Sequence, residues 1–265
     1  MAQSPSVYRF DSAMVREPSH SVIRGLRARD RGAPTYEGVK AEHADYVAAL
    51  RTAGLEVTVL PPLEAFPDSL FIEDPALVFT EGAIVLRPGA PTRTGEAAAL
   101  EPVLHTQFST VLQLPPGGFA DGGDVLVTPK RVFIGRSART DAAGARALAD
   151  CLRKLGRASH IIPTPEGVLH FKTDCALLDD ETVLSTARLA HAGIFEEFKQ
   201  LRVPPGEEAA ANALRVNDVV MVGAQYPRTL DMLDQAGFAV VPLHTTEIGK
   251  IDAGLSCMSL RWRAA

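Results

Sequence analysis

The stretch Asp124-Val125-Leu126-Val127 is the second of three similar segments in which an aspartate directly precedes a short apolar run. The others are Asp74-Pro75-Ala76-Leu77-Val78 and Asp174-Cys175-Ala176-Leu177-Leu178, and the three aspartates follow one another at intervals of fifty residues. Asn212 and Cys257 precede comparable runs, 213–216 and 258–260. Each segment predicts a polar turn, a short strand and a hairpin partner, so the chain contains five like units.

Between these turns, an amphipathic helix that ends at a glycine is followed by a β-branched strand closing on proline. This order occurs three times: helix 46–53 with Gly54 and strand 55–61, helix 142–155 with Gly156 and strand 159–163, and helix 230–236 with Gly237 and strand 238–242. Glycine supplies the left-handed residue that commonly ends a helix.

Five repeated units within one chain of 265 residues predict a closed ring, because a single unit cannot bury its own apolar face. The polar turn residues of successive units would then converge on the central axis. We expect an α/β fold formed by a single domain over residues 1–265. The alternative is a mixed α/β sandwich in which the regular spacing is accidental.

Composition excludes several classes of protein. The net charge of -5 argues against a nucleic-acid partner, since such proteins are usually basic. There is no run of about 18 apolar residues to span a membrane and no secretory leader at the N-terminus. Three cysteines without close spacing favour a reducing cytoplasm over a disulfide framework and give no zinc-finger pattern. We therefore expect a cytoplasmic protein without metal or cofactor, and the sequence leaves homodimer formation open.

Cys257, His170 and Asp121 are the types of residue that form an activated thiol nucleophile. Cys257 follows Gly254-Leu255-Ser256, His170 lies in an apolar stretch, and Asp121 opens the sequence Asp121-Gly122-Gly123-Asp124. Each also has a structural interpretation: a buried cysteine, a buried imidazole or an Asp-Gly turn. We assign Cys151 and Cys175 to the core.

Several ordered motifs resemble those of dimethylarginine dimethylaminohydrolases, particularly the bacterial ones. They are FPDSLFIEDP at 66–75, RPGAP at 87–91 with Arg93, DGGD at 121–124, GRSART at 135–140, LHFK at 169–172 and the segment 251–257. Together these motifs are specific, whereas any one alone is weak. The resemblance implies the five-bladed ββαβ propeller, or pentein fold with pseudo-fivefold symmetry, of the guanidine-modifying superfamily.

The resemblance also implies roles for individual residues. Cys257 would attack the guanidinium carbon of a methylated arginine, His170 would protonate the leaving amine and then activate water, and Asp121 would orient His170. The substrate residues implied by the family are Asp68, Glu73 and Asp74 for the guanidinium, Arg93 and Arg139 for the α-carboxylate, and Asp252 for the α-ammonium group. Residues 24–34 match the position of the family's lid loop.

The implied reaction converts dimethylarginine, and monomethylarginine, to citrulline and an alkylamine. The alternatives are an arginine deiminase or dihydrolase, an amidinotransferase, and a non-catalytic propeller that binds the ribosome. In deiminases and amidinotransferases an aspartate stands two residues after the histidine; here that position is Lys172, which cannot accept a hydrogen bond from a cation. The family's triad acid is glutamate in some members, so the side chain of Asp121 is one methylene shorter than the acid in those members.

Overall fold

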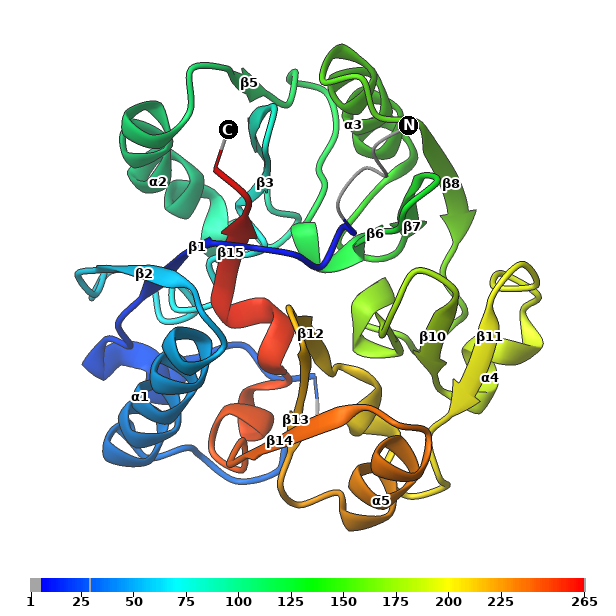
Figure 1. Ribbon diagram of the computed structural model, residues 1–265. Helices are drawn as coiled ribbons and strands as arrows, with labels where there is room; N and C mark the ends of the chain where they lie inside the picture. Colours follow the sequence, from blue (N-terminus) through cyan, green and yellow to red (C-terminus); the bar gives the residue numbers. More distant parts are fainter. Residues whose placement is uncertain (1–5, 29, 265) are drawn as a thin grey trace.

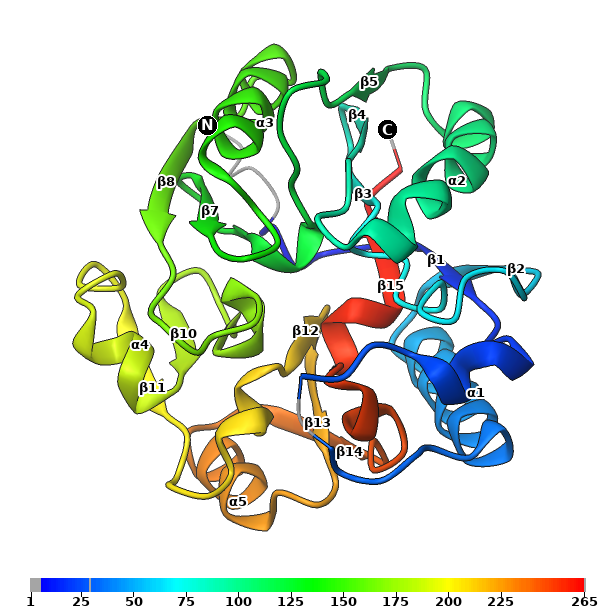
Figure 2. The ribbon, with the colours of Figure 1, turned by 180° about the vertical axis from the view of Figure 1, so that it is seen from behind.

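The computed structural model describes residues 6–28 and 30–264. These residues form five small three-stranded sheets arranged as blades around a central axis, with the long helices on the outside of the ring (Figure 1). The view from behind shows the same ring with its blades in chain order (Figure 2). The α/β propeller expected from the repeated turns is confirmed.

Four of the blades are continuous in the chain and share one topology. Their strands are β3 (Ala76–Phe79), β4 (Gly82–Val85) and β5 (Val111–Gln113); β6 (Val125–Val127), β7 (Val132–Arg136) and β8 (Ser159–Pro163); β9 (Cys175–Leu177), β10 (Thr182–Ser185) and β11 (Lys199–Arg202); and β12 (Leu214–Val216), β13 (Val219–Gly223) and β14 (Ala239–Leu243). In each blade the first two strands are antiparallel and the last two are parallel.

A parallel pair needs a crossover connection, which is usually a helix. The crossovers in these four blades are α2 (Thr94–Gln107), α3 (Ala142–Lys154), α4 (Ala187–His191) and α5 (Pro227–Gln235). Each blade is therefore a ββαβ unit, as expected.

The fifth blade joins the two ends of the chain. The C-terminal strand β15 (Ser259–Trp262) pairs antiparallel with β1 (Ser12–Arg16), so that Ser12 lies opposite Trp262. Strand β1 pairs in parallel with β2 (Glu56–Leu60), and α1 (Tyr36–Thr52) connects them. The ring is thus closed by strands that are remote in sequence (Figure 1).

The predicted helix ends are confirmed more closely than the helix starts. Gly54, Gly156 and Gly237 all have positive φ angles, at 95°, 75° and 90°. Helix α1 begins ten residues earlier than expected, where the Thr35 side chain accepts a hydrogen bond from Gly38 N. Helices α2 and α4 were not predicted.

The apolar core consists of five clusters, each lying between neighbouring blades rather than on the axis. In one cluster, Leu148 and Leu152 of α3 pack with Ile134 of the same blade and Ile84 of the preceding blade. In another, Leu100 of α2 packs with Leu260 of the closing blade. The helices thus cover the outer spaces between the sheets (Figure 1).

Short 3-10 turns connect several of these elements, and some of them lead directly into the first strand of a blade. They are η1 (His20–Arg24), η2 (Pro91–Arg93), η3 (Gly122–Asp124), η4 (Phe171–Thr173), η5 (Glu208–Ala211), η6 (Ile248–Ile251) and η7 (Leu255–Met258). Three polar residues at the ends of axial turns accept a backbone N–H of the following blade: Asp74 from Gly123 at 3.1 Å, Asp124 from Phe171 at 2.8 Å and Asn212 from Ser256 at 3.1 Å. We call these three contacts the inter-blade hydrogen bonds.

The Asp124 contact should be a large contributor to stability. This fully buried carboxylate accepts hydrogen bonds from Phe171 N, Ser137 Oγ and Thr140 Oγ1. Asp124→Ala leaves buried donors unsatisfied, so we expect it to lower the free energy of unfolding by about 3 kcal/mol, measured from urea unfolding curves. Asp124→Asn keeps the acceptor for Phe171 N and should cost roughly half as much or less. Equal midpoints for the wild type and the alanine variant would contradict a structural role for this contact.

Candidate active site

His170 and Asp121 meet at the axis because they hold equivalent positions in neighbouring blades. Each is the extended residue directly before a 3-10 turn, Asp121 before η3 and His170 before η4. His170 Nε2 lies 3.1 Å from Asp121 Oδ2. The other carboxylate oxygen accepts Gly89 N at 2.7 Å, which fixes the orientation of the acid.

Gly123 allows this pair to approach a second acid. A Cβ atom at position 123 would lie 2.8 Å from His170 Nδ1 and 2.9 Å from Asp74 Oδ1, closer than side-chain contacts permit. The glycine of the Asp-Gly-Gly-Asp sequence is therefore needed for close packing between the imidazole and Asp74, in addition to forming a turn.

Asp74 is held by Arg93, which is buried rather than a surface residue. The Arg93 guanidinium donates to Asp74 Oδ2, to Glu96 at 2.7 Å, and to the carbonyl oxygens of Phe71 at 2.9 Å and Asp68 at 3.2 Å. Most of its N–H donors are thus used within the protein. The predicted contact of Arg93 with a substrate carboxylate stays a prediction.

Glu73 forms the centre of a second ion cluster. Its Oε1 atom lies 2.5 Å from Lys172 Nζ and 3.1 Å from the Arg261 guanidinium. Its Oε2 atom is buried without a hydrogen-bond partner among the described residues. Glu73 therefore retains one buried acceptor that a further donor could use.

Cys257 is buried in η7, beside these acids. Its carbonyl oxygen accepts Glu73 N at 3.2 Å, and the amide Nδ2 of Asn212 lies 3.8 Å from its sulfur. The structure thus brings the predicted nucleophile against the loop that carries Glu73 and Asp74.

The carboxylates around His170 determine its charge. Burial alone would lower its pKa, but the charge of Asp74, the hydrogen bond to Asp121 and the charge of Asp124 outweigh burial and raise the pKa to about 9. Burial would raise the pKa of Asp74, but Arg93 outweighs it and lowers that pKa. At neutral pH the site therefore contains a protonated imidazole beside an ionised Asp74.

Nearby carboxylates also raise the pKa of the thiol, which keeps the sulfur uncharged whereas it keeps the imidazole charged. Burial, followed by the charges of Asp74 and Glu73, raises the pKa of Cys257 to about 11. The resting sulfur is therefore a neutral thiol at pH 7. A cation placed beside it would favour the thiolate, which is the reactive form.

Asp74, Asp121 and His170 also offer ligand atoms that lie within 4.8 Å of one another, a spacing that could hold a metal ion. A metal ligand must be a neutral imidazole, whereas the pKa of about 9 keeps His170 protonated at neutral pH. Metal binding at neutral pH would therefore have to displace the proton of His170.

The remaining predicted substrate residues divide into two groups. The Arg139 guanidinium lies 4.0 Å from Asp121, close to the triad. Asp68 and Asp252 instead bind the predicted lid, residues 24–34: Asp68 Oδ1 accepts Leu26 N at 2.9 Å, and Asp252 accepts Ala28 N. Arg29, within this segment, lies outside the described residues. The proposed substrate contacts of Asp68 and Asp252 stay predictions.

Sequence reasoning missed two residues of the site, Arg261 and the amide of Asn212. Arg261 comes from β15 and reaches Glu73 across 188 residues of sequence, so no local pattern indicates it. Asn212 had a signal, because it occupies the turn position where three other units carry aspartate. Cys151 and Cys175 lie in hydrophobic clusters, as expected.

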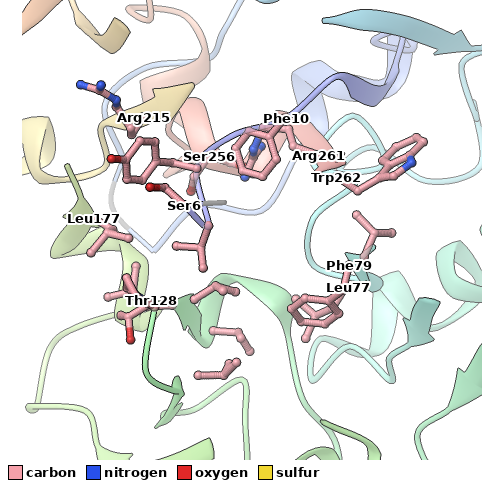
Figure 3. Close-up of a pocket in the computed structure, with 18 of the residues that line it drawn as sticks. Ser6, Phe10, Leu77, Phe79, Thr128, Leu177, Arg215, Ser256, Arg261 and Trp262 are labelled. Atoms are coloured by element: carbon pink, nitrogen blue, oxygen red, sulfur yellow. The ribbon is translucent and has the colours of Figure 1, made fainter. Parts of the chain in front are cut away.

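A cavity of about 710 Å³ follows the axis along the first strands of the blades (Figure 3). Phe10, Phe79 and Trp262 contribute apolar surface, and Arg215 and Arg261 contribute charge. Cys257, His170 and Asp121 do not line this cavity, whereas Glu73, Lys172 and Ser256 do. The Glu73–Lys172 ion pair thus lines the cavity, and the backbone N–H of Glu73 also bonds the carbonyl oxygen of Cys257.

Comparison with known proteins relates this site to guanidine chemistry. A family model described as arginine deiminase matches residues 62–211. A dimethylarginine dimethylaminohydrolase of Pseudomonas aeruginosa is 37% identical over 96% of this chain and 100% of its own length, and one of Streptomyces coelicolor is 32% identical over 95% and 96%. The solved structure of the Pseudomonas enzyme, a cysteine-to-serine mutant complexed with citrulline, has a TM-score of 0.93 and 36% identity, covering 96% of this chain and 100% of that one.

The pKa of about 11 predicts how Cys257 should react with a neutral alkylating reagent such as iodoacetamide. Below that pKa the thiolate fraction rises about tenfold per pH unit, so the alkylation rate should keep rising from pH 7 to pH 10. Cys257→Ser should remove this labelling, because Cys257 is 9% exposed whereas Cys151 and Cys175 are only 2% and 1% exposed. A rate that levels off below pH 8 would show a resting thiolate and contradict the expected pKa.

Proposed function

Since the chain belongs to the dimethylarginine dimethylaminohydrolase family, we propose that it hydrolyses N-omega,N-omega-dimethyl-L-arginine, and monomethylarginine, to L-citrulline and an alkylamine. The observation that carries this proposal is the buried axial cluster of His170, Asp121 and Cys257. His170 is protonated and bonded to Asp121, and the charge of Asp74 acts on both His170 and the nucleophile Cys257. Such a site holds a cation, supplies a sulfur nucleophile and carries a proton for the leaving amine.

The first half of the reaction forms a covalent intermediate. The Cys257 thiol releases its proton to solvent beside the bound guanidinium, and the thiolate forms a bond to the central carbon as the π electrons of the carbon–nitrogen double bond move onto nitrogen. His170 then donates its proton to the departing nitrogen as the carbon–nitrogen bond breaks, releasing dimethylamine or methylamine. The pKa of about 9 keeps that proton on His170 until the amine needs it.

The second half releases citrulline. Neutral His170 accepts a proton from water as the water oxygen attacks the S-linked amidino carbon. The carbon–sulfur bond then breaks and the sulfur leaves with its electron pair. The hydroxyl proton of the adduct is released as the citrulline carbonyl forms, and a proton returns the thiolate to the thiol. Asp121 stabilises the imidazolium in both halves, because its carboxylate faces Nε2.

Acidic residues supply the pocket for the substrate cation. Glu73 Oε2, which is buried and without a partner among the described residues, would accept a guanidinium N–H, and ionised Asp74 would lie beside it. Arg139, near Asp121, would bind the α-carboxylate together with Arg93. Asp252 would meet the α-ammonium group, and Asp68 would join Glu73 and Asp74 at the guanidinium.

Lys172 favours a substituted guanidinium over free arginine. The ammonium group of Lys172 is occupied by Glu73 at 2.5 Å and offers no acceptor to an unsubstituted guanidinium nitrogen. A deiminase or amidinotransferase would be expected to carry aspartate there. The likeness to the N-terminal domain of a cyanobacterial arginine dihydrolase, with a TM-score of 0.85 and 19% identity, shows only a shared fold.

Two further expectations concern the whole protein. Among the described residues, no helix has the length and apolar character needed to cross a bilayer. The cytoplasm stays our proposed location, with a small methylated arginine as the partner, and a homodimer stays a prediction for light scattering to test.

The substrate assignment is tested by measuring citrulline from dimethylarginine, monomethylarginine and arginine under steady-state conditions. We expect turnover of both methylated substrates and a far lower kcat/KM for arginine, because Lys172 provides no acceptor for an unsubstituted nitrogen. Turnover of arginine alone would identify a deiminase. A folded protein inactive on all three, whose Cys257 is not labelled by an arginine-like haloamidine, would favour the non-catalytic binding propeller.

Covalent catalysis is tested by Cys257→Ser. The hydroxyl is a much weaker nucleophile at this site, so turnover should fall by roughly 10⁴-fold or more, while dimethylarginine binding measured by calorimetry stays within a few-fold of the wild type. Mass spectrometry of the wild type quenched during turnover should show an amidino adduct on the peptide containing Cys257. A serine variant that releases citrulline at a rate comparable to the wild type would overturn the covalent mechanism.

A further inference from the structure

We infer that Asn212 is a catalytic residue of this enzyme: its amide donates a hydrogen bond to the sulfur of Cys257, and its carbonyl oxygen holds the segment that carries this cysteine. The inference rests on the proposed function only in taking Cys257 as the nucleophile. It adds a residue from the fourth blade to a site otherwise formed by the other blades.

The two ends of the Asn212 side chain have distinct partners. Its Oδ1 accepts the backbone N–H of Ser256 at 3.1 Å, and an N–H group can only donate. The oxygen must therefore face Ser256, which leaves Nδ2 to face Cys257 Sγ at 3.8 Å. The orientation of the amide is thus determined by chemistry, and its N–H group points to the reacting atom.

The Asn212 side chain packs closely against the backbone of Gly254. A Cβ atom at position 254 would lie 2.4 Å from Asn212 Cγ and 2.7 Å from its Oδ1. Only a residue without a side chain allows the amide to lie this close to the backbone before Cys257. The packing restricts movement of Asn212 relative to the sulfur.

Asn212 is also the exception in the repeated turn. The corresponding residues of three other blades are Asp74, Asp124 and Asp174, and only the turn that faces the cysteine carries an amide in their place. An aspartate there would still accept Ser256 N. It would also add a third carboxylate beside a thiol already opposed by Asp74 and Glu73, and would further disfavour the thiolate.

The effect on rate follows from the balance between thiolate fraction and nucleophilicity. Lowering a thiol pKa by one unit raises the thiolate fraction about tenfold below that pKa, but reduces the intrinsic nucleophilicity only about threefold. A resting thiol with a pKa above the working pH therefore gains from an N–H donor. The donor acts while the S–H proton leaves and before the electron pair of sulfur is committed to the new carbon–sulfur bond.

The test is the pH dependence of Cys257 alkylation by iodoacetamide, together with kcat/KM for dimethylarginine, in Asn212→Asp and Asn212→Ser. For Asn212→Asp we expect the thiol pKa to rise by at least about one unit and kcat/KM at neutral pH to fall roughly tenfold or more. Asn212→Ser, which removes the amide without adding charge, should shift the pKa in the same direction but by less. Circular dichroism and thermal unfolding identify variants that fail to fold.

Asn217→Asp is the matched control, because Asn217 bonds the backbone of Phe10 and Ala53 and none of the proposed catalytic residues. It should keep the wild-type alkylation profile even if it is less stable. Folded Asn212 variants with wild-type alkylation profiles would overturn the inference. Alkylation requires no substrate, so this result stands whether or not the enzyme releases citrulline from dimethylarginine.

Discussion

The structure depends on the inter-blade hydrogen bonds at the axis, in which a polar side chain of one blade accepts a backbone N–H of the next. The apolar clusters lie further out, where each helix packs between its own sheet and a neighbouring one. A ring held together in this way must place hydrogen-bonding side chains on its axis, since buried backbone N–H groups require acceptors. The same turns that join the blades therefore provide positions for chemically active groups.

Several carboxylates lie close together at the axis, and nearby cations neutralise only part of their negative charge. Arg93 keeps Asp74 ionised, and Lys172 with Arg261 offsets Glu73. The remaining negative field acts on His170 and Cys257, keeping the imidazole protonated and the thiol neutral. A bound cation would complete the charge balance and favour the thiolate, so the chemistry of the site starts when a cationic substrate enters.

The sequence predicted the ring because its signals are local: a polar residue before each inner strand and a glycine with positive φ after three helices. Helix α1 was expected too short because its first ten residues contain few apolar side chains, and α2 was missed because Pro102 interrupts its pattern. The triad could be proposed from residue types and family motifs. The pairing of Glu73 with Arg261 and the contacts of Asp68 and Asp252 with the lid could not, because they join segments that only the closed ring brings together.

Equivalent positions in the repeat perform different tasks in the site. The residue before η3 is the acid, the residue before η4 is the imidazole, and the residue before η7 is Gly254, which leaves space for Asn212 beside Cys257. Cys257 lies two residues before the start of β15, which closes the ring against β1. The proposed nucleophile therefore lies beside His170 and Asp121 only in the closed ring, where the two ends of the chain meet in the fifth blade.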